Sequence, residues 1–411
     1  MKINKVITSI IFGVATSIIP PVLLTYGVGQ FNIIRIVGEE LANFWFPISL
    51  GIVSLSICIL NPIGGYLFDK YNSNIFNSRK FILIGSMTGF LSMLFLSYAN
   101  NIIILITFWV LSNFSYGLVS LLYFVLIPKM FKSNSFGKVS GITGSLIPLV
   151  VMAISIIIMG GFSSIPIENK ILLIASIQLA CNLAICRFLD LECVGGMSVN
   201  NRYKEGDCFQ YFYPKFSLYP NFTWTLLSRF CIHIATSGLS MMTLFYIARF
   251  NLTEEKVFEL QAITSLGIIL MIASGILCGY LSDKKRVKKP FVVFSSISIA
   301  ICMFCYSYSE SIIYVIIISF FYQFFWGIFN SVDLALVNQV LPSKDNYAKD
   351  IAIMNTTNNI AKSLVSFITP TILYWGTVWM GDDGYTLFFL IMAIFSILSA
   401  VLVSKVDEKT N

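Results

Sequence analysis

Four ionisable side chains lie inside long apolar stretches of this 411-residue chain: Arg229, His233, Asp333 and Lys362. A charge in hydrocarbon costs about 2.5–3.5 kcal/mol on insertion scales, so such side chains normally face a partner or a water-filled path. Asp333 is the only acid that lies away from the ends of these stretches. It can accept a proton, or it can form a structural ion pair with Arg229 or Lys362, and its position fits both interpretations equally.

His233 is the only histidine of the chain and follows Arg229 by four residues. Residues four apart share one face of a helix. An imidazole titrates near neutral pH and can therefore carry a proton during a reaction cycle. A structural histidine held by a hydrogen bond is the more common case, so both roles stay open.

A polar stripe follows the stretch 351–376. Its members are spaced 3, 1, 3 and 4 residues apart: Asn355, Asn358, Asn359, Lys362 and Ser366. This spacing places them along one face of a helix. Amide groups in hydrocarbon need hydrogen-bond partners, so the face is expected to point inward. It either forms hydrogen bonds between helices or makes a wall that contacts a solute.

The composition indicates that lipid surrounds these elements. Apolar residues make up 57% of the chain and charged residues 11%, whereas a soluble domain carries roughly 25% charged residues. Stretches long enough to cross about 30 Å of hydrocarbon as helices occur at approximately 6–28, 42–66, 80–98, 101–127, 139–161, 169–189, 222–248, 259–281, 290–308, 311–339, 351–376 and 384–404. The chain is therefore expected to be an all-α membrane protein with twelve transmembrane helices.

The basic residues predict the orientation in the membrane. With the N-terminus inside, 21 basic residues fall in inside segments and four, Arg35, Lys170, Arg249 and Lys256, fall outside. Positive residues concentrate on the cytoplasmic side of membrane proteins. Both termini are thus expected in the cytoplasm, with the chain in the cytoplasmic (inner) membrane. The net charge of +7 reflects this topology and does not indicate a nucleic-acid partner.

An internal repeat divides the chain into two related parts. The sequence Gly-Tyr-Leu-Phe-Asp-Lys at 65–70 recurs as Gly-Tyr-Leu-Ser-Asp-Lys at 279–284, an offset of 214 residues. A weaker echo pairs Asn113-x-x-x-Gly117 with Gln323-x-x-x-Gly327, an offset of 210. Duplicated halves explain both matches. We expect a six-helix bundle over 1–190, a polar cytoplasmic linker over 191–217 and a second six-helix bundle over 218–411.

These features resemble the major facilitator superfamily, whose G-x-L-x-D-[RK] signature follows the second span and again the eighth. The matching positions are Gly65, Asp69, Lys70, Gly279, Asp283 and Lys284. The resemblance implies two pseudo-symmetric six-helix bundles and a gating role for the two aspartates, which contact a helix N-terminus on the cytoplasmic face in one conformation. The stretch from Asp333 to Pro370 is similar to bacterial facilitators near sugar–proton symporters and metabolite exporters. Asn113 departs from the pattern, because many proton-driven members carry an arginine there.

We therefore expect a monomeric secondary active transporter that moves a small organic solute by alternating access, with protons as one candidate coupling ion. Symport of a sugar-like solute and efflux of a metabolite both fit, and the low charge of the spans favours a neutral or amphipathic solute. No cofactor or metal is expected. The residues expected along the solute or proton path are Arg229, His233, Asp333, Asn355, Asn358, Asn359, Lys362, Asn113, Gln323 and Tyr26, and Tyr116 and Tyr123 are further candidates to line a cavity.

Two other classes of function compete with transport. A membrane-embedded enzyme would need catalytic groups, but the chain has one histidine and neither H-E-x-x-H nor G-x-S-x-G. An ATP-driven pump would need a G-x-x-x-x-G-K-[ST] loop, which the sequence lacks. A sensor that uses the same fold without transporting is the remaining alternative. The two intact copies of the Gly-Tyr-Leu-x-Asp-Lys signature argue mildly against a sensor.

Overall fold

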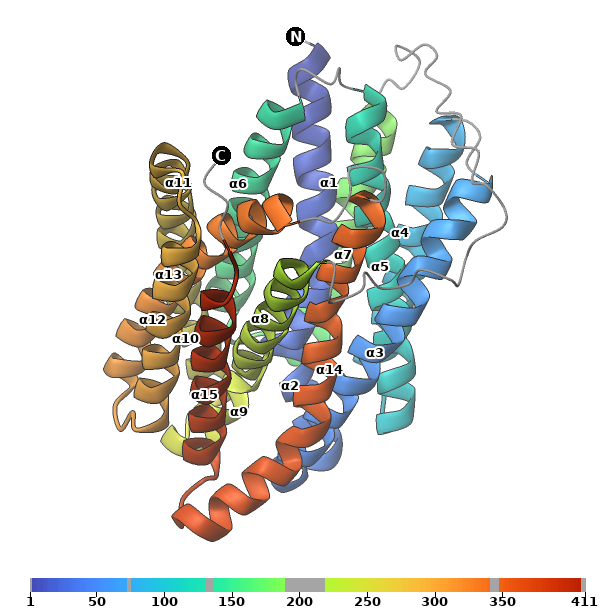
Figure 1. The fold of residues 1–411 in the computed structure, drawn as a ribbon. Coiled ribbons are helices and arrows are strands. Elements are labelled where there is room, and N and C mark those ends of the chain that lie inside the picture. The colour runs from blue at the N-terminus through green and yellow to red at the C-terminus, as the bar shows by residue number, and fades with distance from the viewer. Residues whose placement is uncertain (1, 72–74, 131–135, 189–218, 341–346, 408–411) are drawn as a thin grey trace.

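The computed structural model describes residues 2–71, 75–130, 136–188, 219–340 and 347–407. The described residues form a bundle of long helices, most of them running roughly along one axis, with both chain termini at the same end (Figure 1). We call the opposite end of the bundle the distal end. The linker expected over 191–217 lies outside the described residues, so the boundary between the halves stays a prediction.

The N-terminal helices supply the first six spans. They are α1 (Lys2–Thr25), α2 (Val28–Val37), α3 (Glu39–Tyr71), α4 (Ile75–Ser97), α5 (Ile102–Met130), α6 (Phe136–Ile156), the π-helical turn η2 (Ile157–Gly161) and α7 (Ile167–Phe188). Together α1 and α2 form one crossing, and η2 extends α6.

The C-terminal helices supply the other six. They are α8 (Pro220–Ser237), the 3-10 turn η4 (Gly238–Met241), α9 (Met242–Phe250), α10 (Glu254–Ser265), α11 (Gly267–Lys285), α12 (Lys289–Ser307), α13 (Ile312–Val340), α14 (Tyr347–Met380) and α15 (Tyr385–Ser404). Here α8, η4 and α9 make one crossing, as do α10 and α11.

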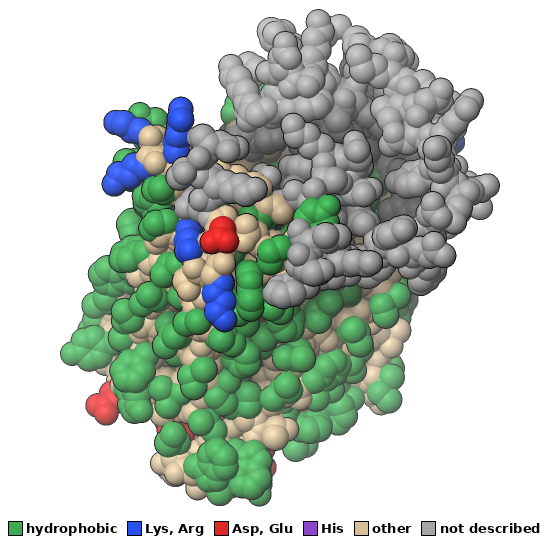
Figure 2. Space-filling model, viewed as in Figure 1, with side chains coloured by type: hydrophobic (Ala, Val, Ile, Leu, Met, Phe, Trp, Pro, Cys, Tyr) green, Lys and Arg blue, Asp and Glu red, His purple; other side chains and the backbone are tan. Residues whose placement is uncertain are grey.

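Eleven segments in the described part of the chain are long and apolar enough to cross a membrane. The remaining helix of the expected twelve is α14, which has 34 residues. It is long enough to cross a membrane, but its polar stripe lowers its mean hydropathy, so it is not among these eleven. The all-α fold with twelve long crossings is confirmed. Apolar side chains cover most of the described surface seen in Figure 2, as contact with lipid requires.

Two crossings are interrupted at equivalent places in the two halves. The first breaks at Tyr26–Gly27 between α1 and α2, and the seventh breaks at η4 between α8 and α9. The positions 26 and 240 differ by 214, which is the offset of the signature repeat. Interrupted helices at the interface between repeats are common where transporters bind their solutes.

The glycines of the weaker repeat allow close packing of helices. A Cβ at Gly327 in α13 would overlap the carbonyl oxygen of Met271 in α11, and a Cβ at Gly117 in α5 would lie 3.4 Å from Asn61 Oδ1 in α3. Both glycines thus face the span that follows the first crossing of their half. The weaker repeat therefore marks glycines that occupy equivalent packing positions in the two halves.

Candidate functional site

The polar groups at the centre of the bundle meet where the two sets of helices face each other. Lys362 lies near the midpoint of α14, and its Nζ lies 3.5 Å from Thr25 Oγ1 at the end of α1. The same ammonium lies 6.0 Å from the centre of the Tyr26 ring. Tyr26 is 42% exposed although it sits at this interface. Its ring is therefore incompletely packed beside Lys362, and we call the surroundings of these two side chains the central space.

The exposure pattern of α14 separates the side of the helix that carries Asn358 and Lys362 from its apolar side. Ile360, Leu364 and Phe367 are exposed apolar side chains, and they fall together on one side of a helix with about 3.6 residues per turn. Asn358 is also exposed, but it lies on the opposite side, next to Lys362. The apolar side therefore faces lipid, and Asn358 faces the interior. Asn359 is half-buried between the two sides.

Contacts between the halves hold the distal end of the bundle together. The Lys170 side chain of α7 is completely buried, and its Nζ donates to Glu254 Oε1 of α10 at 3.1 Å and to the Ser163 carbonyl at 2.7 Å. Its ammonium also lies 3.8 Å from the centre of the Phe258 ring. Ser164 Oγ donates to Glu255 Oε1 at 2.6 Å. We call these residues the distal contact.

Gln30 joins the two interrupted crossings directly. It is completely buried, and its Nε2 donates to the Ser240 carbonyl at 2.6 Å and to the Thr25 carbonyl at 3.0 Å. Its Oε1 accepts from the backbone N–H of Leu244 at 3.1 Å. Backbone groups freed by a break in a helix need other partners at membrane depth. One side chain supplies them for both breaks.

Arg229 of α8 and Asp333 of α13 form a buried ion pair. Arg229 Nε lies 3.3 Å from Asp333 Oδ2, with side-chain exposures of 11% and 4%. His233 is buried one turn further along α8, and its ring packs edge-on against Trp326, with centroids 6.2 Å apart. Within the described residues, His233 Nε2 and Asp333 Oδ1 have no hydrogen-bond partner. This group can therefore accept a proton or a water molecule.

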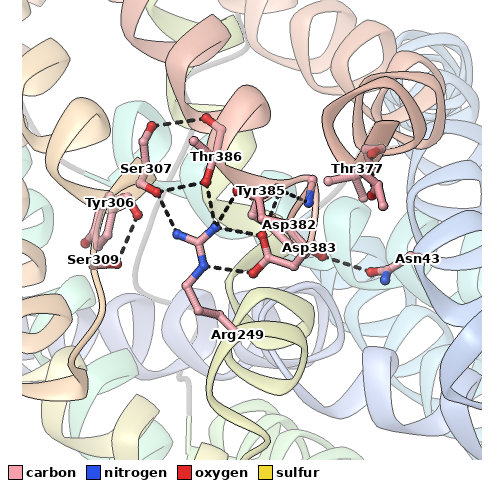
Figure 3. A network of polar contacts seen from close by, with 12 residues as sticks. Asn43, Arg249, Tyr306, Ser307, Ser309, Thr377, Asp382, Asp383, Tyr385 and Thr386 are labelled. Atoms are coloured by element: carbon pink, nitrogen blue, oxygen red, sulfur yellow. Dashed lines mark hydrogen bonds and ion pairs between the residues drawn. The ribbon is translucent and has the colours of Figure 1, made fainter. Parts of the chain in front are cut away.

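Arg249 at the end of α9 organises a second polar network near the distal end (Figure 3). Its guanidinium donates to both carboxylate oxygens of Asp383, at 2.8 and 2.6 Å, and to the Ser307 carbonyl at 2.6 Å. Next to it, Tyr385 donates to Asn43 Oδ1 of α3 at 2.9 Å. The network fixes the turn before α15 and links it to the N-terminal helices.

Other predicted site residues lie away from the central space. Asn113 is buried and donates to the Trp109 carbonyl of its own helix at 3.0 Å. Gln323 packs against Gly267 of α11. Tyr116 and Tyr123 are completely buried, so the expectation that they line an accessible cavity is wrong. Bulky rings pack best between helices, and these two fill positions facing Gly89 and Gly13.

The signature residues are described only in part. Gly279, Asp283 and Lys284 lie in the last turns of α11, with the last two exposed. Gly65, Asp69 and Lys70 fall in the final part of α3, where only the backbone path is described, and the side chain of Asn355 is likewise outside the described residues. Gating by the two aspartates stays a prediction.

The sequence did not predict two features of the site, namely the buried ion pairs of Lys170 and Arg249 and the contacts of Gln30. Lys170 and Arg249 were expected simply as outside basic residues, yet both are mostly or completely buried in ion pairs. Gln30 was not expected to act at all. The adjacent acids Glu254, Glu255, Asp382 and Asp383 were the available signal, because acids at span ends often pair with neighbouring cations. In the described part of the chain, no group of three His, Cys, Asp or Glu residues is arranged to hold a metal ion.

Two sets of membrane-length helices, with interrupted crossings and polar groups gathered between them, define a multi-pass membrane transport protein. The chain belongs to the Major Facilitator Superfamily, whose family model matches residues 6–366. Members of this family are typically transporters and not enzymes. The comparison with curated proteins gives no match.

Solved structures similar to this chain share its whole fold. A D-xylose–proton symporter matches with a TM-score of 0.75 and 14% identity, covering 100% of both chains. A nucleoside transporter matches with a TM-score of 0.70 and 12% identity, covering 98% of both. A bacterial homologue of the human lysosomal transporter Spinster, in an inward-facing and occupied conformation, matches with a TM-score of 0.66 and 10% identity, covering 98% of this chain and 96% of that one. At these identities the likeness concerns the fold.

Proposed function

We propose that this protein moves a small organic solute across the cytoplasmic membrane by alternating access, with the solute held between Tyr26 and the polar side of α14. One observation carries the proposal. The halves are bonded to each other at the distal end, through Lys170 and Glu254, while Tyr26 and Asn358 border open space near the middle. A central space closed at one end is what an intermediate of alternating access requires.

The orientation follows from the charges. The bias of basic residues supports a cytoplasmic location for the termini and for the end that carries them, and Lys and Arg side chains gather at that end on the face shown in Figure 2. The distal contact then closes the extracellular side, and the conformation faces inward. Asp283 is exposed with no ion pair among the described residues. This agrees with a gating bond that forms only when the cytoplasmic ends approach each other.

Counterflow in proteoliposomes tests this function. Vesicles containing the purified protein are loaded with an unlabelled solute, and transient uptake of the same labelled solute is measured across a panel of sugars, nucleosides and organic acids. Exchange of at least one of these solutes, dependent on the protein, is the expected result. Failure of every solute would contradict transport. A solute that is chemically altered without changing compartment would indicate an enzyme instead.

Proton coupling, if present, should depend on the buried group around His233. We expect His233→Gln to abolish accumulation driven by an imposed pH gradient while counterflow continues at a similar rate, because counterflow needs no net proton movement. Both assays use the same preparation, so counterflow shows that the variant protein is still active when accumulation is lost. Equal loss of both activities would assign His233 a structural role, and unchanged accumulation would exclude it as the proton carrier.

A further inference from the structure

The cations within the described bundle differ in whether an acid neutralises them. Four of them have a carboxylate partner, in the pairs Arg35–Glu168, Lys170–Glu254, Arg229–Asp333 and Arg249–Asp383. Lys362, near the middle of α14, differs from these four: among the described residues, no carboxylate lies within ion-pair distance of its ammonium. The nearest groups are the Thr25 hydroxyl and the Tyr26 ring.

The position of Lys362 makes this lack of an acid significant. The residue is near the midpoint of a 34-residue helix, too far from either end for its side chain to reach the aqueous interface easily. It also points toward the central space and not toward lipid, since it shares the side of α14 opposite Ile360 and Leu364. A cation at this depth normally has a partner, and such positions mark the paths of substrates or ions.

We propose that the missing partner is the solute, and that the solute is an organic monoanion whose carboxylate pairs with Lys362. This inference rests on the proposed transport function and names its substrate class. It replaces the neutral solute that the low overall charge of the spans favoured, because Lys362, the half-buried ionic group beside Tyr26, is positive and has no acid partner among the described residues. The four ion pairs elsewhere cancel and add no net charge.

The groups near Lys362 restrict which organic anions could bind there. A zwitterion would bring an ammonium that needs an acid, and Asp333 is already paired with Arg229. A dianion would carry a second negative charge, and the described central space holds no second free cation. The ring of Tyr26 offers an apolar surface, and the exposed Asn358 amide offers hydrogen bonds. A carboxylate joined to a hydroxylated or compact apolar body therefore fits best.

Matched pairs of probes test the assignment with the purified full-length protein. Gluconate is compared with sorbitol, glucuronate with glucose, and benzoate with benzyl alcohol, at constant ionic strength. Binding is measured by the thermal shift of the detergent-solubilised protein and exchange by counterflow. The variants are Lys362→Gln, Lys362→Arg and the control Lys256→Gln, which removes an exposed lysine near the start of α10.

The wild-type protein should prefer the anion in at least one pair. Lys362→Gln should weaken anion binding about tenfold or more, the scale of one lost charge-assisted contact, while Lys362→Arg and Lys256→Gln should retain the preference. Lys362→Gln should unfold at the same temperature as the wild type or higher without solute, because an uncompensated charge is removed. An unchanged or higher unfolding temperature would exclude misfolding as the cause of the lost binding.

The experiment distinguishes failure of the anion assignment from failure of the transport proposal. Exchange of neutral solutes without any preference for anions, or an anion preference that survives in Lys362→Gln, would overturn the assignment and leave transport standing. Anion binding that depends on Lys362 without exchange in vesicles would support the anion site and contradict transport. Absence of both binding and exchange across all pairs would contradict both proposals.

Discussion

A disulfide across the halves is expected to abolish exchange completely. In a cysteine-free background, Gly160→Cys in η2 and Ala262→Cys in α10 should cross-link on oxidation, because a Cβ at Gly160 would lie 3.1 Å from the Cβ of Ala262. Disulfides have Cβ–Cβ separations of about 3.5–4.5 Å, so a shift of a few tenths of an ångström suffices. The cross-link would keep the distal end closed, and counterflow should fall to background until a reductant restores it.

A cross-link within one half is the matched control. Ser228 of α8 and Ser399 of α15 have hydroxyl oxygens 2.9 Å apart, and both belong to the C-terminal helices. Oxidation of Ser228→Cys with Ser399→Cys should leave counterflow largely intact, since alternating access moves the halves as units. Full activity in the oxidised Gly160→Cys, Ala262→Cys protein would show that the distal end need not open, and would remove the basis for the proposed mechanism.

Loss of one partner of the buried ion pair should strongly destabilise the protein. We expect Asp333→Asn to lower the free energy of unfolding by about 3–5 kcal/mol, because the Arg229 guanidinium would be left buried without its counter-charge. Both side chains are nearly inaccessible, with exposures of 11% and 4%, so solvent cannot compensate. Denaturant unfolding in mixed micelles gives the measurement.

The double replacement separates charge from shape. Arg229→Met with Asp333→Leu removes both charges and keeps apolar volume, and such swaps of buried pairs are often neutral or stabilising. We expect the double variant to regain most of the stability lost in Asp333→Asn. Asp283→Asn, at an exposed carboxylate, should change stability little. An Asp333→Asn protein as stable as the wild type would indicate that Asp333 is already protonated in the folded state.

Much of the architecture follows from one-dimensional properties of the sequence. The twelve apolar stretches match the observed crossings because the need to bury backbone groups in lipid acts on each segment separately. The signature repeat at 65–70 and 279–284 indicated the duplication, and the interrupted crossings at 26 and 240 share its offset. The spacing of Asn358 and Lys362 placed them on one side of α14, because helical periodicity is also local.

The partners of the charged residues could not be read in this way. Lys170 and Glu254 are 84 residues apart, and Gln30 reaches Ser240 across 210 residues. These contacts exist only because one half docks against the other, and no local pattern encodes the docking geometry. Arg229 was a possible partner for Asp333, but so was Lys362 on charge alone. The packing of α8 beside α13 decided between them, and within the described part of the chain Lys362 has no acid partner.

By itself, the sequence determined which segments cross the membrane, how the chain is duplicated and which few polar groups must be buried, since hydrophobicity and periodicity are properties of each segment. Only the tertiary structure decided which buried charges neutralise each other, where the crossings break and at which end of the bundle Lys170 and Glu254 join the halves. Those features depend on distances between helices far apart in the chain, and a charge is paired or free only in relation to the groups that folding places around it.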